Sequence, residues 1–356
     1  MKIAFLVPYS KKYFYQKGGV SDLSVKGKDI WFFKYIPDRS IEVDIIGCLA
    51  SFTYKKRVPL VIVQILSFFP LARKYDVVIS SGFMNGIFFS AIRKLIRVKK
   101  FIHIILDTRA IGALKPHKTI ILRIARYLLS SVDGVICFSQ NHKYFWEKYL
   151  GFSGKVISAP WPMEANLKSI YPVVGDYIFS GGSTKRDWKT LISAAEKINS
   201  KFIIAAGKDS ASGKYGLEDI NIPKNIKVLF DIPSKQYRKL ISKALFAIIP
   251  LKNVLTDVGW ETLTQAMTMG KVVIVTKIPP LEHYIEDGKT GLFVEPNNSE
   301  DFREKILFLL QNPQEIERIG KNAKEKMEES KSGRKITAEK LWLMLQKIII
   351  NKNVPK

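Results

Sequence analysis

The chain has 356 residues, of which 47% are hydrophobic and 25% charged. This composition excludes an intrinsically disordered protein, and the length fits two α/β domains, since domains usually have about 100–200 residues. The two cysteines, Cys48 and Cys137, lie far apart and show no CxxC spacing. This excludes a thiolate metal cluster within the chain and indicates a reducing, cytoplasmic compartment.

The formal net charge is +25, and it is unevenly distributed. Residues 1–165 contain 26 Lys and Arg against 10 Asp and Glu, so they carry +16 of the excess. One interpretation is a solvated, lysine-rich surface of the kind found in hyperthermophiles. The other is an anionic partner. Acidic residues are scarce here, whereas the thermophile pattern enriches Glu as well as Lys, and this favours the anionic partner.

The N-terminal apolar run, 2–7, is followed by Pro8 and predicts a first β-strand instead of a signal peptide. The longest nearly apolar stretch, 58–72, is interrupted by two prolines and a glutamine. A membrane-spanning helix needs about 20 apolar residues, and this stretch is shorter. We therefore expect a soluble or monotopic protein.

Short apolar runs alternate with amphipathic helical patterns along the whole chain, at 2–7, 43–47, 76–80, 101–107, 134–139, 177–181, 201–207, 226–230, 247–251 and 272–276. This pattern is typical of parallel sheets that helices cover on both faces. It restarts near Tyr177, after a proline-bearing linker from Ala159 to Pro172. We predict an α/β protein with two doubly wound, Rossmann-like domains facing across a cleft. The domains are 1–165 and 172–335, with a final helix at 336–350 packing back on the first.

The most informative stretch runs from Asp257 to Thr276 and reads DVGWETLTQAMTMGKVVIVT. Thr256 or Asp257 is the expected N-cap of a helix, and Gly259 allows a ligand to approach the backbone closely. The helix is predicted to end at Met269, before Gly270. Its N-terminus offers N–H groups and a positive dipole to an anion such as a diphosphate.

Three polar side chains of this stretch, Asp257, Glu261 and Gln265, are spaced by four residues. This spacing predicts that they lie along one face of the helix, where they can contact a polyhydroxyl ligand. The alternative is an ordinary capped helix with a polar face.

These motifs resemble group 1 (family 4) glycosyltransferases, whose nucleotide-binding domain reads roughly G-x-x-x-L-x-E-A-M-x-x-G-K-P-V-I. The resemblance continues through Y-I-E-D-G-K-T-G-L-F-V-E-P at 284–296 and includes S-G-G-S-T-K-R-D at 180–187. In the first half it covers V-D-G-V-I-C-F-S at 132–139 and Pro160-Trp161. It is continuous over 177–325 and looser before residue 130.

The resemblance implies a GT-B fold and a hexose transfer from a nucleotide sugar, UDP- or GDP-linked, to a lipid-linked or polymeric glycan acceptor. It also implies retention of anomeric configuration, no catalytic metal, and no cofactor besides the donor substrate. Catalysis in the family is mainly electrostatic, because negative charge develops on the leaving nucleoside diphosphate. Lys185 and Arg186 follow the Gly181-Gly182 turn where the family keeps basic side chains that bind the diphosphate.

Other positions match the family less closely. Gly18-Gly19 matches a loop that approaches the donor phosphates or the acceptor, while the family's Arg before the basic pair is replaced by Gly181. The family's E-x7-E pair falls on Asp257 and Gln265, and Glu261 is the alternative carboxylate.

Asp107, with Arg109 beside it, ends the apolar run 101–107, where many members have a catalytic His or Asp. Asp107 is thus a candidate catalytic residue facing the reacting sugar, with capping of the following turn as an equal alternative. His103 lies inside the run and is interpreted as a core residue. His142 and His283 have no metal-ligand spacing and are interpreted as structural or surface residues.

Basic and apolar residues intermix at 54–57, 93–100 and 118–129. Such segments suit an anionic membrane surface, so we expect peripheral attachment to the inner face of the membrane. The alternative is a set of buried helices whose cations reach solvent at their edges. No RNP, KH, helix-turn-helix or zinc-finger signature occurs, so a nucleic-acid partner is not expected. Two alternative functions stay open: a catalytically inactive GT-B subunit that binds a partner, and a basic nucleic-acid-binding protein. A GT-B epimerase is less favoured.

Overall fold

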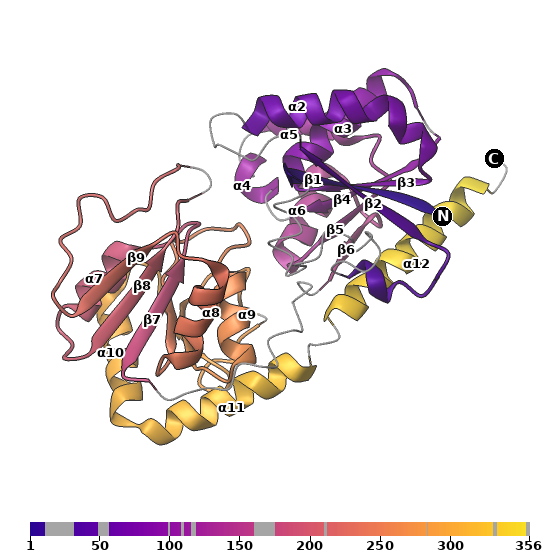
Figure 1. Cartoon of the computed structure of the whole chain (residues 1–356). Coiled ribbons are helices and arrows are strands. Elements are labelled where there is room, and N and C mark those ends of the chain that lie inside the picture. Colours follow the sequence, from indigo (N-terminus) through magenta and orange to yellow (C-terminus); the bar gives the residue numbers. More distant parts are fainter. Residues whose placement is uncertain are drawn as a thin grey trace. The chain divides into compact units, whose positions relative to one another are not determined.

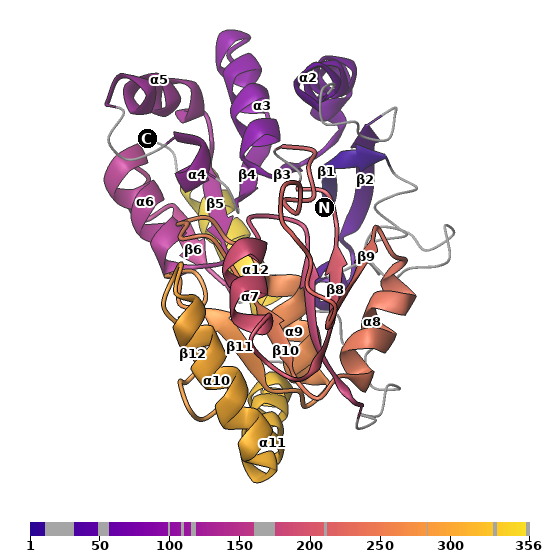
Figure 2. The ribbon, with the colours of Figure 1, turned by 90° about the vertical axis from the view of Figure 1, so that its left-hand side faces the viewer.

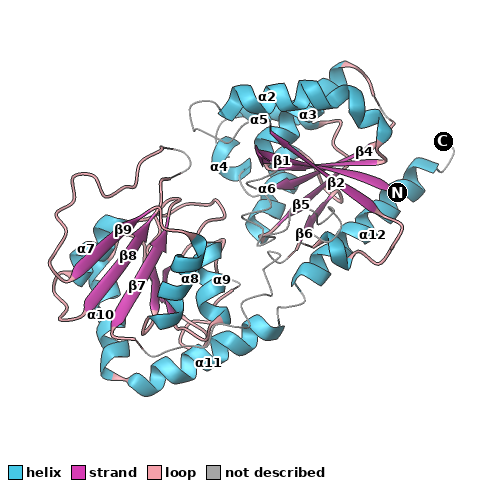
Figure 3. Ribbon diagram, in the orientation of Figure 1, coloured by secondary structure: helices cyan, strands magenta, loops and turns pink. Residues whose placement is uncertain are grey.

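The computed structural model describes residues 1–10, 32–48, 57–98, 100–107, 110–114, 119–159, 175–209, 212–282, 284–329 and 333–353. The chain divides into two compact units, residues 1–164 with 332–356 and residues 165–331. Each unit is built on one six-stranded sheet, and every strand pairing within it is parallel (Figure 1). Figure 3 shows the helices flanking the strands in both units.

The sheet of the first unit has the strand order β2-β1-β3-β4-β5-β6. Its strands are β1 (Lys2–Ser10), β2 (Glu42–Cys48), β3 (Val77–Ser81), β4 (Ile102–Asp107), β5 (Gly134–Cys137) and β6 (Val156–Ser158). Its helices are η2 (Phe33–Tyr35), α2 (Arg57–Phe68), η4 (Phe69–Lys74), α3 (Phe83–Leu95), α4 (Ala110–Leu114), α5 (Thr119–Leu129), α6 (Gln140–Leu150) and α12 (Gly333–Asn353).

Two helical layers cover this sheet. On one face, α2 and α3 bury Ile65 and Phe89 against β1 and β3, while α4, α5 and α6 cover β4 and β5. On the other face, η2 and α12 pack against Phe5, Ile79 and Ile104. Helix α12, from the C-terminal end of the chain, lies against the N-terminal sheet (Figures 1 and 2), and its Leu341 and Leu345 belong to the core on that face. Among the described helices, none is long and apolar enough to cross a bilayer.

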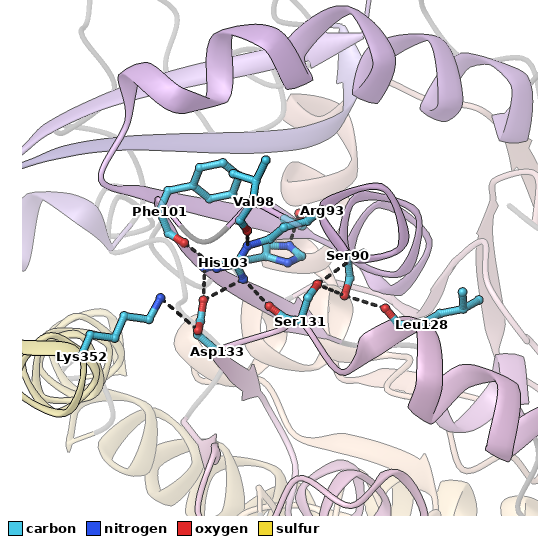
Figure 4. Close-up of polar contacts among 10 residues, drawn as sticks. Ser90, Arg93, Val98, Phe101, His103, Leu128, Ser131, Asp133 and Lys352 are labelled. Atoms are coloured by element: carbon cyan, nitrogen blue, oxygen red, sulfur yellow. Dashed lines mark hydrogen bonds and ion pairs between the residues drawn. The ribbon is translucent and has the colours of Figure 1, made fainter. Parts of the chain in front are cut away.

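A buried ion pair joins the elements of the first unit (Figure 4). Nη1 of Arg93, on α3, lies 2.8 Å from Oδ2 of Asp133, at the start of β5. The same guanidinium donates to the carbonyls of Val98, 3.1 Å away, and Phe101, 2.6 Å away. The Asp133 carboxylate also accepts from the backbone N–H of His103 and pairs with Lys352 of α12 at 3.1 Å. One carboxylate therefore connects α3, β4, β5 and the last helix.

The sheet of the second unit has the strand order β12-β11-β10-β7-β8-β9. Its strands are β7 (Tyr177–Gly182), β8 (Lys201–Ala206), β9 (Ile226–Phe230), β10 (Ala247–Ile249), β11 (Val273–Thr276) and β12 (Leu292–Val294). Its helices are α7 (Trp188–Ala195), α8 (Ser234–Lys243), α9 (Trp260–Thr268), α10 (Ser299–Gln311) and α11 (Pro313–Glu329).

The predicted α/β class with two parallel sheets is confirmed, and each predicted apolar run corresponds to a strand. The sequence missed β6 and β12. Both are edge strands of three residues, too short to stand out as apolar runs against the helical patterns around them.

The buried ion pair leads to a stability prediction. Asp133→Ala leaves the Arg93 guanidinium buried without its counter-charge, so we expect the unfolding free energy of the first unit to fall by about 3–5 kcal/mol. The matched control is Lys352→Ala, which removes only the more exposed partner of Asp133 and is expected to cost less than about 1 kcal/mol. Urea unfolding followed by circular dichroism measures both, and equal effects of the two variants would contradict this account.

Candidate functional site

The topology of the second sheet selects one place for a ligand. From β7 the chain moves outward through β8 and β9, and then returns to the other side of β7 to form β10, β11 and β12. The strand order therefore reverses between β7 and β10. In open parallel sheets ligands bind beyond the carboxyl ends of the strands at such a switch point. Here those ends are Gly181-Gly182 of β7 and Ile249 of β10, which Pro250 follows.

The two glycines at the end of β7 are required by close packing. A Cβ on Gly181 would lie 2.7 Å from Cε2 of Tyr237 and 2.8 Å from the ring of Phe179. Gly182 has φ of +127°, and a Cβ there would overlap the Arg186 guanidinium. Only a residue without a side chain lets the strand end this close to the arginine. The two glycines were predicted to form a turn, but they end strand β7, and the packing of the protein itself explains why they are glycines.

Arg186 links the loop after β7 to the start of α9. Its side chain is buried, and Nε donates to the Gly181 carbonyl at 2.9 Å while Nη1 donates to the Thr184 carbonyl at 3.0 Å. Nη2 donates to Oγ1 of Thr262, in the first turn of α9, at 3.3 Å. Burial lowers the pKa of Arg186 from its ordinary value. An arginine stays charged in proteins, so a cation is held in the loop at the switch point.

Thr262 and Tyr237 complete this cluster, and the sequence analysis did not select either residue. The Tyr237 hydroxyl, on α8, lies 2.6 Å from Oγ1 of Thr262. Oγ1 of Thr262 also lies 3.3 Å from the Gly181 carbonyl. Burial raises the pKa of Tyr237 to about 12, so the phenol stays protonated at neutral pH. Thr262 lies inside the family-like stretch, but no motif marks Tyr237, which reaches the site only through the packing of α8.

Lys185 lies in the same loop with φ of +55°. Its backbone N–H donates to Oδ2 of Asp209 at 2.9 Å, and its carbonyl accepts from the N–H of Lys252 at 3.0 Å. The half-buried Lys185 and the buried Arg186 are thus held beside the segment that follows β10 and leads into α9. The structure brings together the two basic residues that the sequence proposed for diphosphate binding.

The start of α9 differs from the expectation. The N-cap is Gly259, in the left-handed region with φ of +86°, and not Thr256 or Asp257. A Cβ on Gly259 would lie 3.0 Å from Cδ1 of Leu251, which explains why glycine occupies this position. The cap supplies no side-chain acceptor. The first N–H groups of a helix have no partners within it, so this start is suited to an anion.

The three polar residues spaced by four do not share one helical face. Asp257 precedes the cap and lies in the loop, so the prediction was wrong for this residue. Glu261 is exposed in the first turn, and Gln265 is one turn further along the same face. Oε1 of Gln265 is buried and has no hydrogen-bond partner among the described residues. Among the described residues, the Gln265 amide oxygen is thus a buried acceptor without a donor.

Of the site residues proposed in the first unit, the structure describes only Asp107. Asp107 is fully buried, and it accepts from Nε1 of Trp146 at 2.7 Å and from the backbone N–H of Ala110 at 3.0 Å. These bonds match the capping alternative, and the catalytic role stays a prediction. Gly18, Gly19 and Arg109 lie outside the described residues.

The described histidines are structural. His103 is fully buried with Nε2 3.0 Å from Oγ of Ser80, and burial lowers its pKa well below its ordinary value. His142 is buried, and its Nδ1 lies 3.2 Å from Oγ of Ser139. Within the described ranges, no three His, Cys, Asp or Glu side chains form a group that fits a metal ion. His283 lies outside these ranges.

Comparisons of the sequence find similarity to glycosyltransferases, mainly in the second unit. Residues 181–326 match the family model described as glycosyl transferases group 1. An uncharacterized glycosyltransferase of Methanocaldococcus jannaschii is 26% identical over 208 residues, which is 56% of this chain and 56% of that protein. Trehalose synthase of Thermococcus litoralis is 31% identical over 114 residues, 32% of this chain and 27% of the enzyme. The chain thus spans about half the length of these curated relatives, or less.

Solved structures resemble the whole chain. Sucrose-phosphate synthase from Thermosynechococcus elongatus has a TM-score of 0.74 at 16% identity, covering 97% of this chain and 99% of that one. Anabaena HepE in complex with UDP has a TM-score of 0.68 at 15% identity, covering 98% and 100%. The chain therefore has the two-domain GT-B fold of these glycosyltransferases. The residues that match the group 1 glycosyl transferase model, 181–326, lie in the stretch where the sequence shows its continuous resemblance to these enzymes.

The cluster around Arg186 leads to a binding prediction. Arg186→Gln removes the cation and is expected to weaken binding of UDP or GDP by about 10- to 150-fold, the loss of a charge-assisted hydrogen bond. Arg186→Lys keeps the charge but loses the fork geometry, so its effect should be smaller. Lys189→Gln, an exposed cation on the adjacent α7, is the charge-matched control. Calorimetric titration measures the affinities, and unchanged affinity in a folded Arg186→Gln variant would refute the assignment.

Proposed function

We propose that the protein is a nucleotide-sugar-dependent glycosyltransferase that moves a hexose from a UDP- or GDP-sugar to a lipid-linked or polymeric glycan acceptor. One observation carries the proposal: the segment that matches the family model combines a strand end of two glycines, a buried arginine and an uncapped helix start at one switch point. The structurally similar HepE was solved in complex with UDP, which supports a uridine donor.

In this proposal the protein supplies the charge that the leaving group needs. Negative charge develops on the diphosphate as the bond between the anomeric carbon and the phosphate oxygen breaks. The N–H groups at the start of α9 and the side chains of Lys185 and Arg186 stabilise that charge. Glu261 and Gln265 bind hydroxyl groups of the donor on the same face of α9. The proposed transfer retains the anomeric configuration and uses no metal, since protein cations replace it at the diphosphate.

The location of the enzyme is part of the proposal. The chain has only two cysteines, far apart and without CxxC spacing, which suits a reducing compartment. We place the enzyme in the cytoplasm, at the inner face of the membrane, where a lipid-linked acceptor is presented.

A second candidate is an inactive GT-B subunit that binds a partner. It is favoured by Gln265, a neutral amide at a position where the family keeps a carboxylate, and by the loop position of Asp257. It differs from the enzyme in one measurable respect, because a binding subunit does not turn over its nucleotide sugar.

A panel of donors tests the enzymatic function. The purified chain is incubated with UDP-glucose, UDP-galactose, UDP-N-acetylglucosamine, GDP-mannose and GDP-glucose, and release of nucleoside diphosphate is measured with and without a lipid extract. We expect slow hydrolysis of one donor that the acceptor accelerates, with Gln265→Ala lowering the rate. Tight UDP or GDP binding without turnover of any donor would favour the inactive subunit.

Chelation tests the proposed role of protein cations. Turnover is expected to persist in EDTA within about twofold, because the diphosphate charge is neutralised by Arg186, Lys185 and the helix start. Initial rates are compared before and after dialysis against EDTA, with a manganese-dependent glycosyltransferase as the control. Loss of activity that manganese restores would contradict the assignment.

A further inference from the structure

Helix α5 carries apolar side chains on both of its faces. Leu122, Ala125 and Leu129 are buried in the core of the first unit. On the opposite face, Ile120 is 74% exposed, Ile124 55% and Tyr127 65%. A surface helix of a globular protein normally presents polar residues there. The outward apolar stripe of α5 is therefore not part of the core. We expect a partner to cover it.

The end of α3 extends this stripe. Nζ of Lys94 lies 3.1 Å from the centre of the Tyr127 ring and donates to the Tyr127 carbonyl at 2.9 Å. The next two residues, Leu95 and Ile96, are 83% and 52% exposed. The exposed apolar residues of α5 and of the end of α3 together form a surface that we call the α5 face. Its members are Leu95, Ile96, Ile120, Ile121, Ile124 and Tyr127. Contiguous exposed apolar patches of this kind mark interaction surfaces.

The same layer continues to α2. Helices α2, α3 and α5 lie side by side on one side of the sheet, as both views show (Figures 1 and 2). Val63, Leu66 and Leu71 of the α2–η4 segment are also exposed. Exposed apolar side chains therefore recur along this helical layer.

The chain segment that carries the α5 face is almost entirely positive in its charges. Residues 83–131 contain ten Lys and Arg and one acid, Asp107, which is fully buried. Arg123 and Arg126 are exposed on α5 next to the apolar stripe, and Arg97 is exposed after α3. An interfacial helix has this combination, because its cations attract anionic headgroups while its apolar side chains enter the boundary beneath them.

We propose that the α5 face docks on an anionic lipid bilayer, with Ile120, Ile124 and Leu95 entering the headgroup boundary. A second copy of the chain fits this face poorly, because a two-fold contact would bring Arg123 and Arg126 against their own copies without an acid to balance them. A nucleic acid would match the cations but not the isoleucines. Docking is independent of sugar transfer; only its use to meet a lipid-linked acceptor rests on the proposed function.

Vesicle co-sedimentation of the full chain tests the docking. With vesicles of phosphatidylglycerol and phosphatidylcholine, we expect binding at low salt that weakens as salt rises, because surface attraction is screened within about 8 Å at physiological ionic strength. Arg123→Gln with Arg126→Gln should lower the partition coefficient about 25-fold, since each cation contributes about fivefold. Ile120→Ser with Ile124→Ser should lower it by about tenfold or more.

Two matched controls separate the α5 face from general charge and general hydrophobicity. Lys224→Gln with Lys227→Gln removes two exposed cations from the second unit, and Leu343→Ser removes an exposed leucine from α12. Both should bind vesicles like the unmodified chain. Donor hydrolysis in solution should be unchanged in the α5 variants, so a failure of docking and a failure of the enzymatic function remain distinguishable.

The outcomes are decisive in each direction. Loss of vesicle binding in the α5 variants alone supports the proposal. Absence of binding to anionic vesicles at low salt, or equal loss in the controls, overturns it. The mass of the protein in solution is measured by sedimentation equilibrium. If the unmodified chain is a dimer and the double variant Ile120→Ser with Ile124→Ser is a monomer, the proposal is also overturned, because the face would then bind a second copy.

Discussion

The candidate site depends on one interaction, the set of hydrogen bonds that the buried Arg186 guanidinium makes. Its three nitrogens reach the Gly181 carbonyl, the Thr184 carbonyl and Thr262, so the end of β7, its loop and the first turn of α9 are held together. A buried charge is tolerated only with such partners. The absence of a side chain at Gly182 follows directly, because the guanidinium occupies the space that a Cβ would need.

The cations of this chain fall into two groups with different physical roles. Arg186 and Arg93 are buried, and each is satisfied mainly by backbone carbonyls, with Asp133 as the added counter-charge of Arg93. They hold secondary-structure elements together. Arg123 and Arg126 are exposed on a helix whose neighbourhood has almost no acids, so their field points outward. The net charge of +25 alone does not distinguish these groups.

Some expectations failed because neighbours in space override local preference. Asp257 has the side chain of a good N-cap, yet Gly259 starts α9, since the approach of Leu251 favours a glycine in the left-handed region there. Asp107, for which the sequence leaves catalysis and capping as equal alternatives, accepts a hydrogen bond from Trp146, distant in sequence, inside the core, and its catalytic role stays a prediction. Tyr237 reaches the site because α8 packs beside α9, and no spacing in the sequence indicates this.

The sequence by itself determined ten of the twelve described strands, the two-sheet class and the resemblance of the second unit to group 1 glycosyltransferases. These follow from apolar periodicity and from glycines that a closely packed strand end requires, and both are properties of short segments. Only the tertiary structure decided which polar groups meet. It brought Arg186 to Thr262 and Lys352 to Asp133, and it left Ile120 and Ile124 outside the core. The reason is physical: a hydrogen bond or an exposed surface depends on atoms from several segments, whose distances local sequence does not encode.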